Sequence, residues 1–473
     1  MRDDNINKNI FRIAQVFIVL FVILLINLSY IQIVKSDWYT NNSLNARIIN
    51  RENSILRGDI IDSTGKKLVY SEKQNNEIKR MYPYGEICAF PIGYFGKNIG
   101  SAGIEQTQNI DLAGLNMTMH KLGPIEQLFE GKKGNTIKLT LDVNLQKTAW
   151  NAIGQRRGAA VVMDADTGAV LVMASRPAFN PNTINEDWDK LRNDKNSPLI
   201  NRAAQGLYPP GSSIKPLIAD AALQQKIISP DTRINCGPFY DLGNGQKIYE
   251  ADKATYGNIN LDEGLIHSSN VMFAGLAVKL GNKELQQAFS RFGFYDKVKS
   301  DFYTQTPHMP DFGKLSTGET AQVGIGQADL LVTPLRMAML AEAFINQGKI
   351  MQPYLVDSVQ TLDGVTIRTT SPTLFKEATD VNRAELINSY MADVVKKGTG
   401  KNAHVNGIEI AGKTGTAENS QGADHAWFMG TACVKGRNIA FAVILENSGF
   451  GGAEAAPIIK QIITTMLRED YDV

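Results

Sequence analysis

A serine and a lysine three positions apart form the sharpest local signal in the chain. They are Ser212 and Lys215 in Tyr208-Pro-Pro-Gly-Ser-Ser-Ile-Lys-Pro216. Proline and glycine end the preceding segment and helical spacing follows, so Ser212 is expected at a helix N-terminus with Lys215 on the same face. This predicts a nucleophile with a base in reach and free N–H groups for an oxyanion. Ser63 and Lys66 repeat the spacing in an evident turn, so the pattern alone also fits a helix cap followed by a surface lysine.

A second lysine motif follows a predicted strand near the C-terminus. Lys413-Thr-Gly415-Thr416 comes after the apolar strand residues 408–411. Strand alternation puts Lys413 and Gly415 on one side and the two threonines on the other. The missing side chain at Gly415 would let a substrate backbone lie against this strand. The other interpretation is an edge strand that turns into a loop, where lysine is common.

A Ser-x-Asn triplet, Ser268-Ser-Asn270, lies between two stretches with helical spacing. It is weak by itself, because Ser43-Leu-Asn45 has the same pattern. The three motifs nevertheless follow one another in the order Ser-x-x-Lys, Ser-x-Asn, Lys-Thr-Gly, which is the order found in penicillin-binding proteins and serine β-lactamases. Three coincidental matches in this order are improbable, so their joint occurrence favours catalysis.

The elements expected around these motifs predict an α+β domain. Residues 158–164 and 169–175 read as a hairpin, and residues 187–347 as mainly helical. Further strands are expected at 407–412, 426–434 and 438–446, and an amphipathic helix at 456–467. Two strands, a helical insertion, three strands and a helix make an antiparallel sheet with helices packed on it. Cys433, within an apolar strand, is expected to be buried.

The N-terminus predicts an uncleaved membrane anchor. No charged residue lies between Arg12 and Lys35, and about twenty apolar residues span a bilayer core. A cleaved signal peptide is disfavoured, because no small-x-small site follows and the apolar run is too long. The basic residues weakly favour a cytoplasmic N-terminus, which places the remaining mass outside the cell.

Composition excludes several function classes. The 473 residues carry 49 Lys+Arg and 48 Asp+Glu, a formal charge of +1 that provides no footprint for nucleic acid. Three cysteines and five histidines show no metal-ligand spacing. No metal site and no cofactor is therefore expected.

On these motifs the sequence resembles the class B penicillin-binding proteins, the transpeptidases of peptidoglycan synthesis, and within them the compact PbpA-like subgroup. Residues 57–62 and 102–105 look like the family's pedestal motifs. Gly324-Ile-Gly-Gln327 with Val332-Thr-Pro-Leu335 matches the segment before its long helix, and 425–428 matches its fourth sheet strand. Tyr256-Gly257 stands where many relatives have His-Gly.

The resemblance implies a transpeptidase fold, a five-stranded antiparallel sheet with helices on both sides, preceded by a small pedestal and one transmembrane helix. We expect a cytoplasmic tail at 1–12, the anchor at 13–34, a loop-rich pedestal or dimerisation-like module at 35–145 and the transpeptidase domain at 146–473.

The resemblance also implies an acyl-enzyme mechanism. Ser212 would attack the carbonyl of the penultimate D-Ala of a stem peptide and expel the terminal D-Ala. Neutral Lys215 would take the hydroxyl proton, since burial near Lys413 lowers its pKa. Ser268 would relay the proton to the leaving amine, and Asn270 would hydrogen-bond the substrate amide and help hold Lys215.

The remaining motif residues would bind substrate. Lys413, Thr414 and Thr416 would receive the terminal carboxylate beside Gly415, and the N–H groups of Ser212 and Thr416 would form the oxyanion hole. An amine from a neighbouring stem would then resolve the acyl-enzyme into a cross-link. A β-lactam would imitate D-Ala-D-Ala and leave a slowly released acyl group.

Several alternatives stay open. A β-lactamase or a D,D-carboxypeptidase would pass the acyl group to water, although Glu385 is no convincing match to the lactamase glutamate. A catalytically silent scaffold or a β-lactam-sensing receptor would need no turnover. The expected partners are stem peptides, β-lactams, the membrane and a polymerase of the shape, elongation, division and sporulation (SEDS) family.

Overall fold

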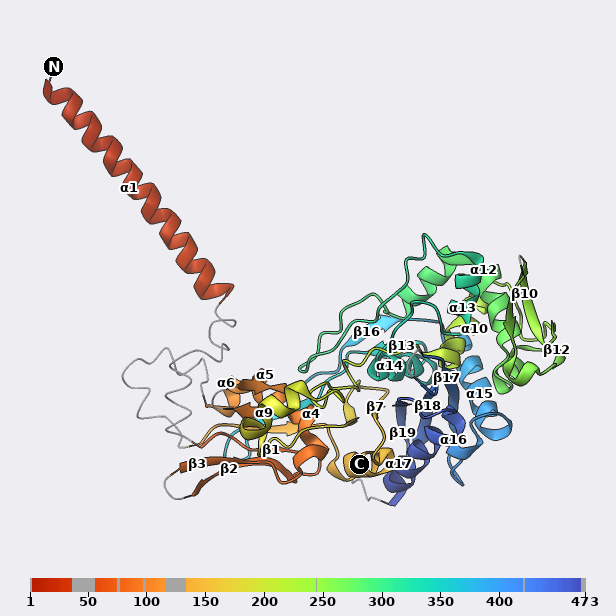
Figure 1. Ribbon diagram of the computed structural model, residues 1–473. Coiled ribbons are helices and arrows are strands. Elements are labelled where there is room, and N and C mark those ends of the chain that lie inside the picture. Colours follow the sequence, from red (N-terminus) through yellow and green to blue (C-terminus); the bar gives the residue numbers. More distant parts are fainter. Residues whose placement is uncertain are drawn as a thin grey trace.

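The computed structural model describes residues 2–35, 56–74, 77–96, 99–114, 133–243, 245–419 and 422–468. One long helix, α1 (Arg2–Ile33), stands apart from the folded part (Figure 1). Its residues Ile10–Ile33 are long and apolar enough to cross a membrane, and none of this segment is buried in the protein.

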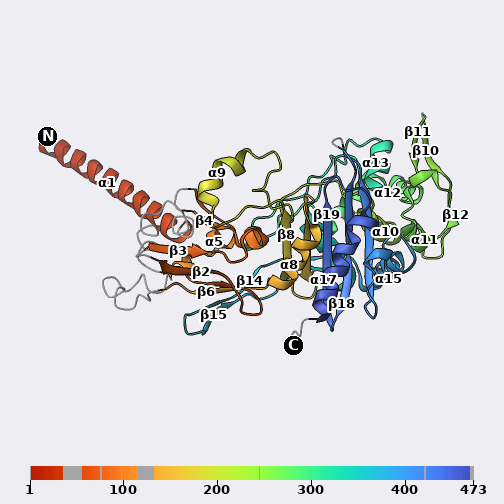
Figure 2. The same cartoon turned by 60° about the horizontal axis from the view of Figure 1, so that its bottom comes forward.

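The main sheet has five antiparallel strands in the order β17-β18-β19-β7-β8. Its strands β8, β18 and β19 are labelled in Figure 2. The two halves of the sheet come from segments on either side of the long helical insertion, as the sequence predicted. The strands are β7 (Gly158–Asp164), β8 (Val170–Arg176), β17 (Ile410–Ala417), β18 (His425–Val434) and β19 (Arg437–Leu445).

Helices cover both faces of this sheet. Alternate residues of β7 divide between two cores: Val161 and Met163 join one, Ala160 and Val162 the other. The first core is built with α10 (Lys215–Gln224), α12 (Asn270–Arg291), α14 (Pro334–Ile345) and α15 (Val381–Lys397). The second is built with α8 (Val143–Ile153) and α17 (Ala456–Arg468). Because every β7 residue is buried, the strand reads as a continuous apolar run.

The segment expected to be mainly helical also contains strands. Alongside α9 (Ile184–Asn193), α11 (Leu261–Ile266) and α13 (Thr317–Gly324), it holds two antiparallel pairs. These are β9 (Ile234–Cys236) with β12 (Gly257–Ile259), and β10 (Phe239–Gly243) with β11 (Gln246–Tyr249). Such short, partly exposed strands carry too little hydrophobic alternation to be found by periodicity.

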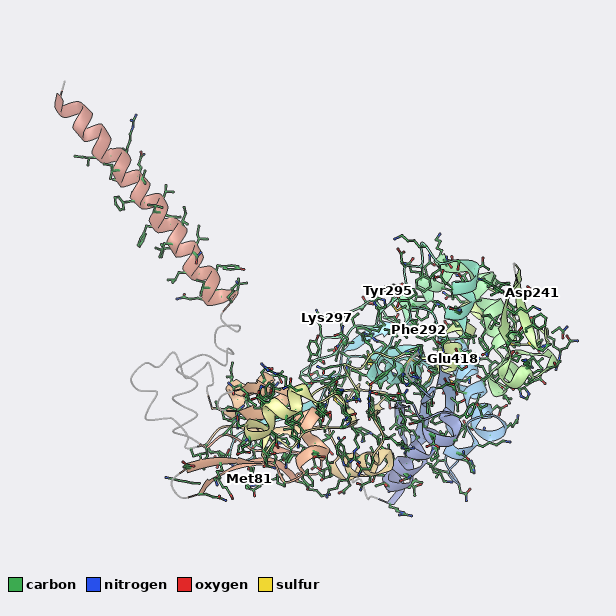
Figure 3. All side chains as sticks on the ribbon, viewed as in Figure 1. Met81, Asp241, Phe292, Tyr295, Lys297 and Glu418 are labelled. Carbon is green, nitrogen blue, oxygen red and sulfur yellow. The ribbon has the colours of Figure 1, made fainter. Side chains whose placement is uncertain are left out.

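The segment before β7 is more regular than predicted. A six-stranded sheet runs in the order β15-β14-β6-β1-β2-β3. Its strands are β1 (Ile60–Ile61), β2 (Lys67–Gln74), β3 (Glu77–Met81), β6 (Thr136–Leu139), β14 (Val356–Gln360) and β15 (Thr366–Thr369). The last two strands follow α14 in the chain, so this sheet joins early and late segments. Met81 in β3 and Asp241 in β10 mark opposite ends of the folded part (Figure 3).

Short elements complete the fold around the two sheets. They are η1 (Gly85–Cys88), α4 (Ala89–Ile92), β4 (Tyr94–Gly96), β5 (Gly100–Ala102), α5 (Gly103–Thr107), α6 (Asn109–Leu112), β13 (Lys349–Met351), β16 (Leu374–Glu377), η5 (Lys401–Ala403) and α16 (Gly451–Glu454). Cys433 is exposed, not buried. It pairs with Asn438 beside the β18–β19 turn, and its neighbours Ala432 and Val434 point to the buried face of the strand.

The two pedestal-like motifs meet at a buried carboxylate. Glu105 is fully buried and binds Arg57 Nε at 2.6 Å and Arg80 Nε at 2.7 Å. Burial alone would raise the pKa of Glu105, but the two guanidinium groups hold it below its usual value. The motifs around residues 57 and 105 are therefore parts of one ion-paired core.

Candidate active site

The Ser-x-x-Lys motif forms a tight turn that leads into a helix. Ser212 is half-buried in the 3-10 turn η3 (Gly211–Ile214), and α10 begins at Lys215. In a 3-10 turn residues three apart lie above one another, so Ser212 and Lys215 share a face. Gly211 has φ +54°, and a Cβ there would lie 2.5 Å from the carbonyl oxygen of Thr416. Glycine therefore lets η3, called the serine turn below, lie directly against β17.

The Lys215 ammonium ties the first motif to the second. Its Nζ donates to Ser268 O at 2.6 Å, to Asn270 Oδ1 at 2.8 Å and to Ser268 Oγ at 3.3 Å. Ser268 is non-glycine and has φ +57°, a left-handed conformation that costs about 1–2 kcal/mol. This conformation allows the carbonyl and the hydroxyl of one residue to face the same ammonium.

The third motif lies within the edge strand β17. The strand continues to Ala417, so the alternative of a strand that turns into a loop at Lys413 does not apply. Lys413 Nζ is fully buried and donates to Ser268 Oγ at 2.9 Å. Thr414 points the other way and its hydroxyl lies 2.6 Å from that of Thr399. The observed alternation is therefore the predicted one.

Gly415 is required by the packing of the protein itself. A Cβ at this position would lie 2.9 Å from Pro210 O and 3.1 Å from Ser213 N. These contacts are with the serine turn, so the glycine brings β17 against η3. The sequence had predicted a substrate contact as the reason for this glycine.

Two buried lysines thus meet at one serine hydroxyl. Burial lowers the pKa of Lys215 to about 7, although the negative charge of Glu250 acts in the opposite direction. Burial, and then the charge of Lys215, lowers the pKa of Lys413 well below its ordinary value. A neutral lysine is therefore accessible at the site near neutral pH, which is the form that accepts a proton.

A segment that precedes α14 supports the serine turn from behind. Gly211 N donates to Gly326 O at 2.9 Å, and Tyr208 and Val332 exchange backbone hydrogen bonds of 3.0 and 2.8 Å. Trp427 Nε1 of β18 donates to Pro209 O at 3.0 Å. These contacts explain why residues 324–335 accompany the three motifs.

Gly326→Ala is expected to slow acylation of the serine at least about a hundredfold, because a displacement of about 1 Å suffices for such a loss. Gly326 has φ +77°, and a Cβ would lie 2.0 Å from Gly211 O, so the serine turn must move. The rate of adduct formation with a fluorescent penicillin measures the effect. Gly364→Ala is the matched control, since Gly364 has φ +81° but open space around it. Equal rates in both variants would contradict the expectation.

Residues outside the three motifs complete the site, and sequence reasoning missed most of them. Glu250 lies beneath the Ser-x-Asn motif, and Glu446 Oε1 accepts from Tyr208 Oη at 2.8 Å and from Arg202 Nε at 2.7 Å. Neither carboxylate has a local sequence signal. Tyr256, the departure from His-Gly, stacks on His267 with ring centroids 4.7 Å apart.

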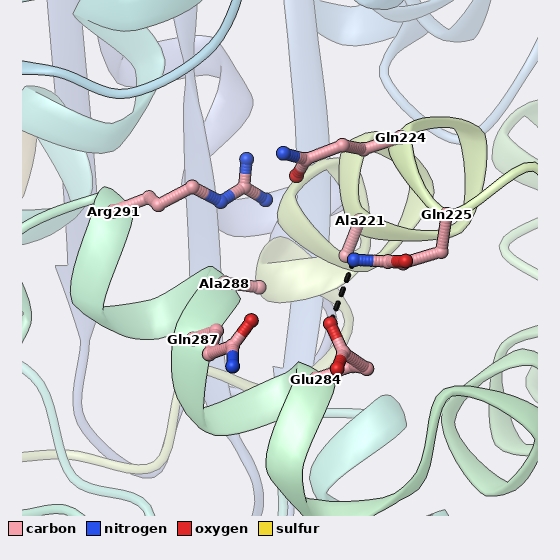
Figure 4. Close-up of a pocket in the computed structure, with 7 residues that line it drawn as sticks. All are labelled: Ala221, Gln224, Gln225, Glu284, Gln287, Ala288 and Arg291. Carbon is pink, nitrogen blue, oxygen red and sulfur yellow. Dashed lines mark hydrogen bonds between the residues drawn. The ribbon is translucent and has the colours of Figure 1, made fainter.

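A pocket on the described part of the surface is separate from the three motifs. This small pocket on α10 and α12 is lined by Gln225, Glu284 and Arg291 among others, and Gln225 Nε2 donates to Glu284 Oε2 at 2.6 Å (Figure 4). No residue of the three motifs lines it. Within the described ranges no group of three or more His, Cys, Asp or Glu side chains could hold a metal ion.

Comparison with known families and proteins gives consistent matches. The family model for the penicillin binding protein transpeptidase domain matches residues 158–464, and that for the penicillin binding protein A dimerisation domain matches residues 57–136. The chain is 31% identical to the peptidoglycan D,D-transpeptidase PbpA of Mycolicibacterium smegmatis, with 98% of this chain and 99% of that one covered. It is also 31% identical to MrdA of Salmonella typhimurium, with 84% and 74% covered.

Solved structures agree. Penicillin-binding protein A from M. tuberculosis, as its ceftriaxone acyl-enzyme complex, superposes with a TM-score of 0.82 at 26% identity over 89% of this chain and 100% of that one. The D,D-transpeptidase domain of a peptidoglycan glycosyltransferase from Eggerthella lenta superposes with a TM-score of 0.78 at 32% identity over 87% and 98%. The three motifs lie at one site, and helices cover both faces of the sheet. Because the family model and these relatives also match, the chain belongs to the penicillin-binding protein transpeptidase family.

Proposed function

We propose that this transpeptidase cross-links peptidoglycan stem peptides through an acyl-enzyme on Ser212. The observation that carries the proposal is the contact of Lys215 and Lys413 with the hydroxyl of Ser268, beside the serine turn. These groups form a route for one proton between a base and a leaving group.

The reaction starts when Ser212 Oγ attacks the penultimate D-Ala carbonyl. Neutral Lys215 takes the hydroxyl proton, and Ser268 passes a proton to the departing terminal D-Ala as the C–N bond breaks. The N–H groups of Ser212 and Thr416 stabilise the oxyanion. Asn270 hydrogen-bonds the substrate amide and holds Lys215.

The rest of the site orients the donor and receives the acceptor. Thr414 and Thr416, on one face of β17, bind the terminal carboxylate beside Gly415, and Lys413 on the other face adds positive charge to the site. An amine of a second stem then attacks the acyl carbonyl. Its proton passes through Lys215 to Ser212 Oγ as the ester bond breaks, which releases Ser212. β-Lactams acylate the same serine.

Incubation of the full chain in detergent with a fluorescent penicillin, followed by intact mass, tests the proposal. A stable one-to-one adduct is expected. Hydrolysed penicillin without an adduct would indicate a β-lactamase. Release of D-Ala from a stem peptide with transfer of the acyl group to water alone would indicate a carboxypeptidase. Intact penicillin without an adduct would favour a silent scaffold.

Acylation is expected to accelerate as pH rises through about 7. Below the Lys215 pKa of about 7 the base is protonated, so each unit of lower pH should slow acylation up to tenfold. Second-order acylation constants from pH 5 to pH 9 measure this. A flat profile would contradict a role for Lys215 as base.

The helix α1 is proposed to anchor the chain in the cell membrane as a single pass, with residues 1–12 cytoplasmic and the catalytic part outside the cell. We divide the chain into the anchor at 13–34, a pedestal module at 35–145 and a transpeptidase domain at 146–473. The two separate sheets support this division, although β14 and β15 complete the pedestal sheet. A cysteine introduced near either end of α1 and labelled in intact cells tests the orientation.

The partner is proposed to be a SEDS-family glycan polymerase, since the chain belongs to a transpeptidase family and a cross-linking enzyme needs nascent glycan strands. Stimulation of such a polymerase of the same cell by the full chain is the expected result. Failure of the full chain to stimulate such a polymerase or to co-purify with it would count against the pairing.

A further inference from the structure

A buried carboxylate lies beneath the Ser-x-Asn motif. Glu250 directly follows β11 and is 3% exposed. Its oxygens accept from the Ser269 hydroxyl, from Asn270 N at 2.6 Å and from Val271 N at 3.2 Å. One side chain from the β10–β11 hairpin therefore binds three consecutive residues at the start of α12.

These bonds supply partners that the helix itself cannot provide. The first N–H groups of a helix have no intrahelical acceptor, and negative charge is favourable there. Ser269 is the N-cap of α12 and accepts from Met272 N. The Ser269 hydroxyl donates to Glu250, so this side chain uses both its donor and its acceptor capacity. These two bonds fix the direction in which α12 begins.

The fixed start of α12 bears on the conformation of Ser268. Ser269 N donates to Gly264 O at 2.9 Å and Ser268 N to Leu265 O at 3.1 Å, which fixes the chain on one side. Glu250 fixes it on the other. A left-handed serine persists only where its surroundings determine it, and this conformation is the one that turns Ser268 O toward Lys215.

Glu250 also supplies charge. Two lysine side chains, Lys215 on α10 and Lys413 on β17, lie at the Ser268 hydroxyl, and the Phe273 ring on α12 is 5.5 Å from Lys215 Nζ. Burial raises the pKa of the nearby thiol of Cys236 on β9, so this group is neutral. Among the described residues, Glu250 is the carboxylate whose negative charge acts on Lys215.

We propose that Glu250 is a positioning residue, which holds Ser268 and Asn270 against Lys215 and provides the negative charge that acts on Lys215. The proposal rests on the function proposed above. It assigns to the β10–β11 hairpin, which carries no catalytic motif, a role in aligning the proton route.

The charge and the geometry predict separate effects. Removal of the charge lowers the pKa of Lys215, because a negative neighbour favours the protonated form. The pH midpoint of acylation should therefore fall. Disturbed hydrogen bonds to Ser269 and Asn270 should instead lower the maximal rate, whatever the pH.

Penicillin acylation constants from pH 5 to pH 9 for full-length variants test this. Glu250→Gln is expected to lower the midpoint by about one pH unit and the maximal rate at least about tenfold. Glu250→Asp keeps the charge, so its midpoint stays near the wild-type value while the maximal rate falls. Glu263→Gln is the matched control, since Glu263 caps the neighbouring helix α11 by accepting from Asn260 N at 2.9 Å.

A Glu250→Gln variant with the wild-type midpoint and rate would overturn the inference while leaving the proposed function intact. An equal shift in Glu263→Gln would also overturn it, because it would show a general effect of helix capping. If thermal unfolding shows that Glu250→Gln does not fold, Glu250→Asp decides: a wild-type maximal rate overturns the proposal, a reduced rate at unchanged midpoint supports it. Absence of any adduct in the wild-type protein would overturn the proposed function as well.

Discussion

Ser212→Ala is expected to abolish the penicillin adduct and to slow release of D-Ala from a stem peptide by about four to six orders of magnitude. The variant has no hydroxyl to form the acyl ester. Lys215, Ser268 and Lys413 keep their mutual contacts, because these do not involve the Ser212 side chain. Intact mass after incubation with a fluorescent penicillin measures the loss, and thermal unfolding shows that the fold remains.

The neighbouring serine provides a strict control. Ser213 lies in the same turn, is fully buried and donates from Oγ to Pro210 O at 2.6 Å. Ser213→Ala should lower the free energy of unfolding by about 1 kcal/mol and still form the adduct. An adduct that survives in Ser212→Ala would place the nucleophile elsewhere, and peptide mapping would locate it.

Lys215→Met is expected to slow acylation about a thousandfold or more, within the range of general-base and nucleophile-activating groups. Methionine fills most of the volume of the lysine stem beside Phe273. It cannot take a proton from Ser212, nor donate to Ser268 O and Asn270 Oδ1. Lys279→Met, on the exposed face of α12, is the control and should acylate normally.

The same variant should be at least as stable as the wild type at low pH. A lysine with a lowered pKa opposes folding wherever it is protonated in both states, that is below its folded pKa of about 7. As pH rises from about 7 towards 10.5, the native state loses this proton before the unfolded state does, and the wild type regains stability. Lys215→Met should therefore show its largest relative gain in unfolding free energy below pH 7. Urea unfolding at pH 5.5 and pH 9 measures this difference, and a variant that is both inactive and unstable at pH 5.5 would contradict it.

Local pattern was sufficient for much of the architecture. The β7–β8 hairpin, the C-terminal strands β18 and β19, and α17 are long, apolar and regular, so their periodicity reports them directly. The α+β class and the covered five-stranded sheet follow from their order. The identity and order of the three motifs likewise needed nothing beyond the sequence.

Long-range pairing decided what the sequence could not show. Strand β14 pairs with β6 across more than two hundred residues, and β15 pairs with β14. No local feature says which sheet a short strand will enter. The same holds for β9 to β12, whose few residues carry little alternation.

The site divides in the same way. The sequence determined which side chains could attack, accept a proton and bind a carboxylate, because these are chemical properties of Ser212, Lys215 and Lys413. Only the tertiary structure decided that both lysines reach one Ser268 hydroxyl. It also decided that Gly326 packs against the turn that carries Ser212 and that Glu250 binds the Ser-x-Asn motif. Burial and the approach of segments distant in the chain lower the pKa of Lys215 and hold Ser268 at a left-handed φ. Neither effect is a property of a residue's immediate neighbours in the sequence.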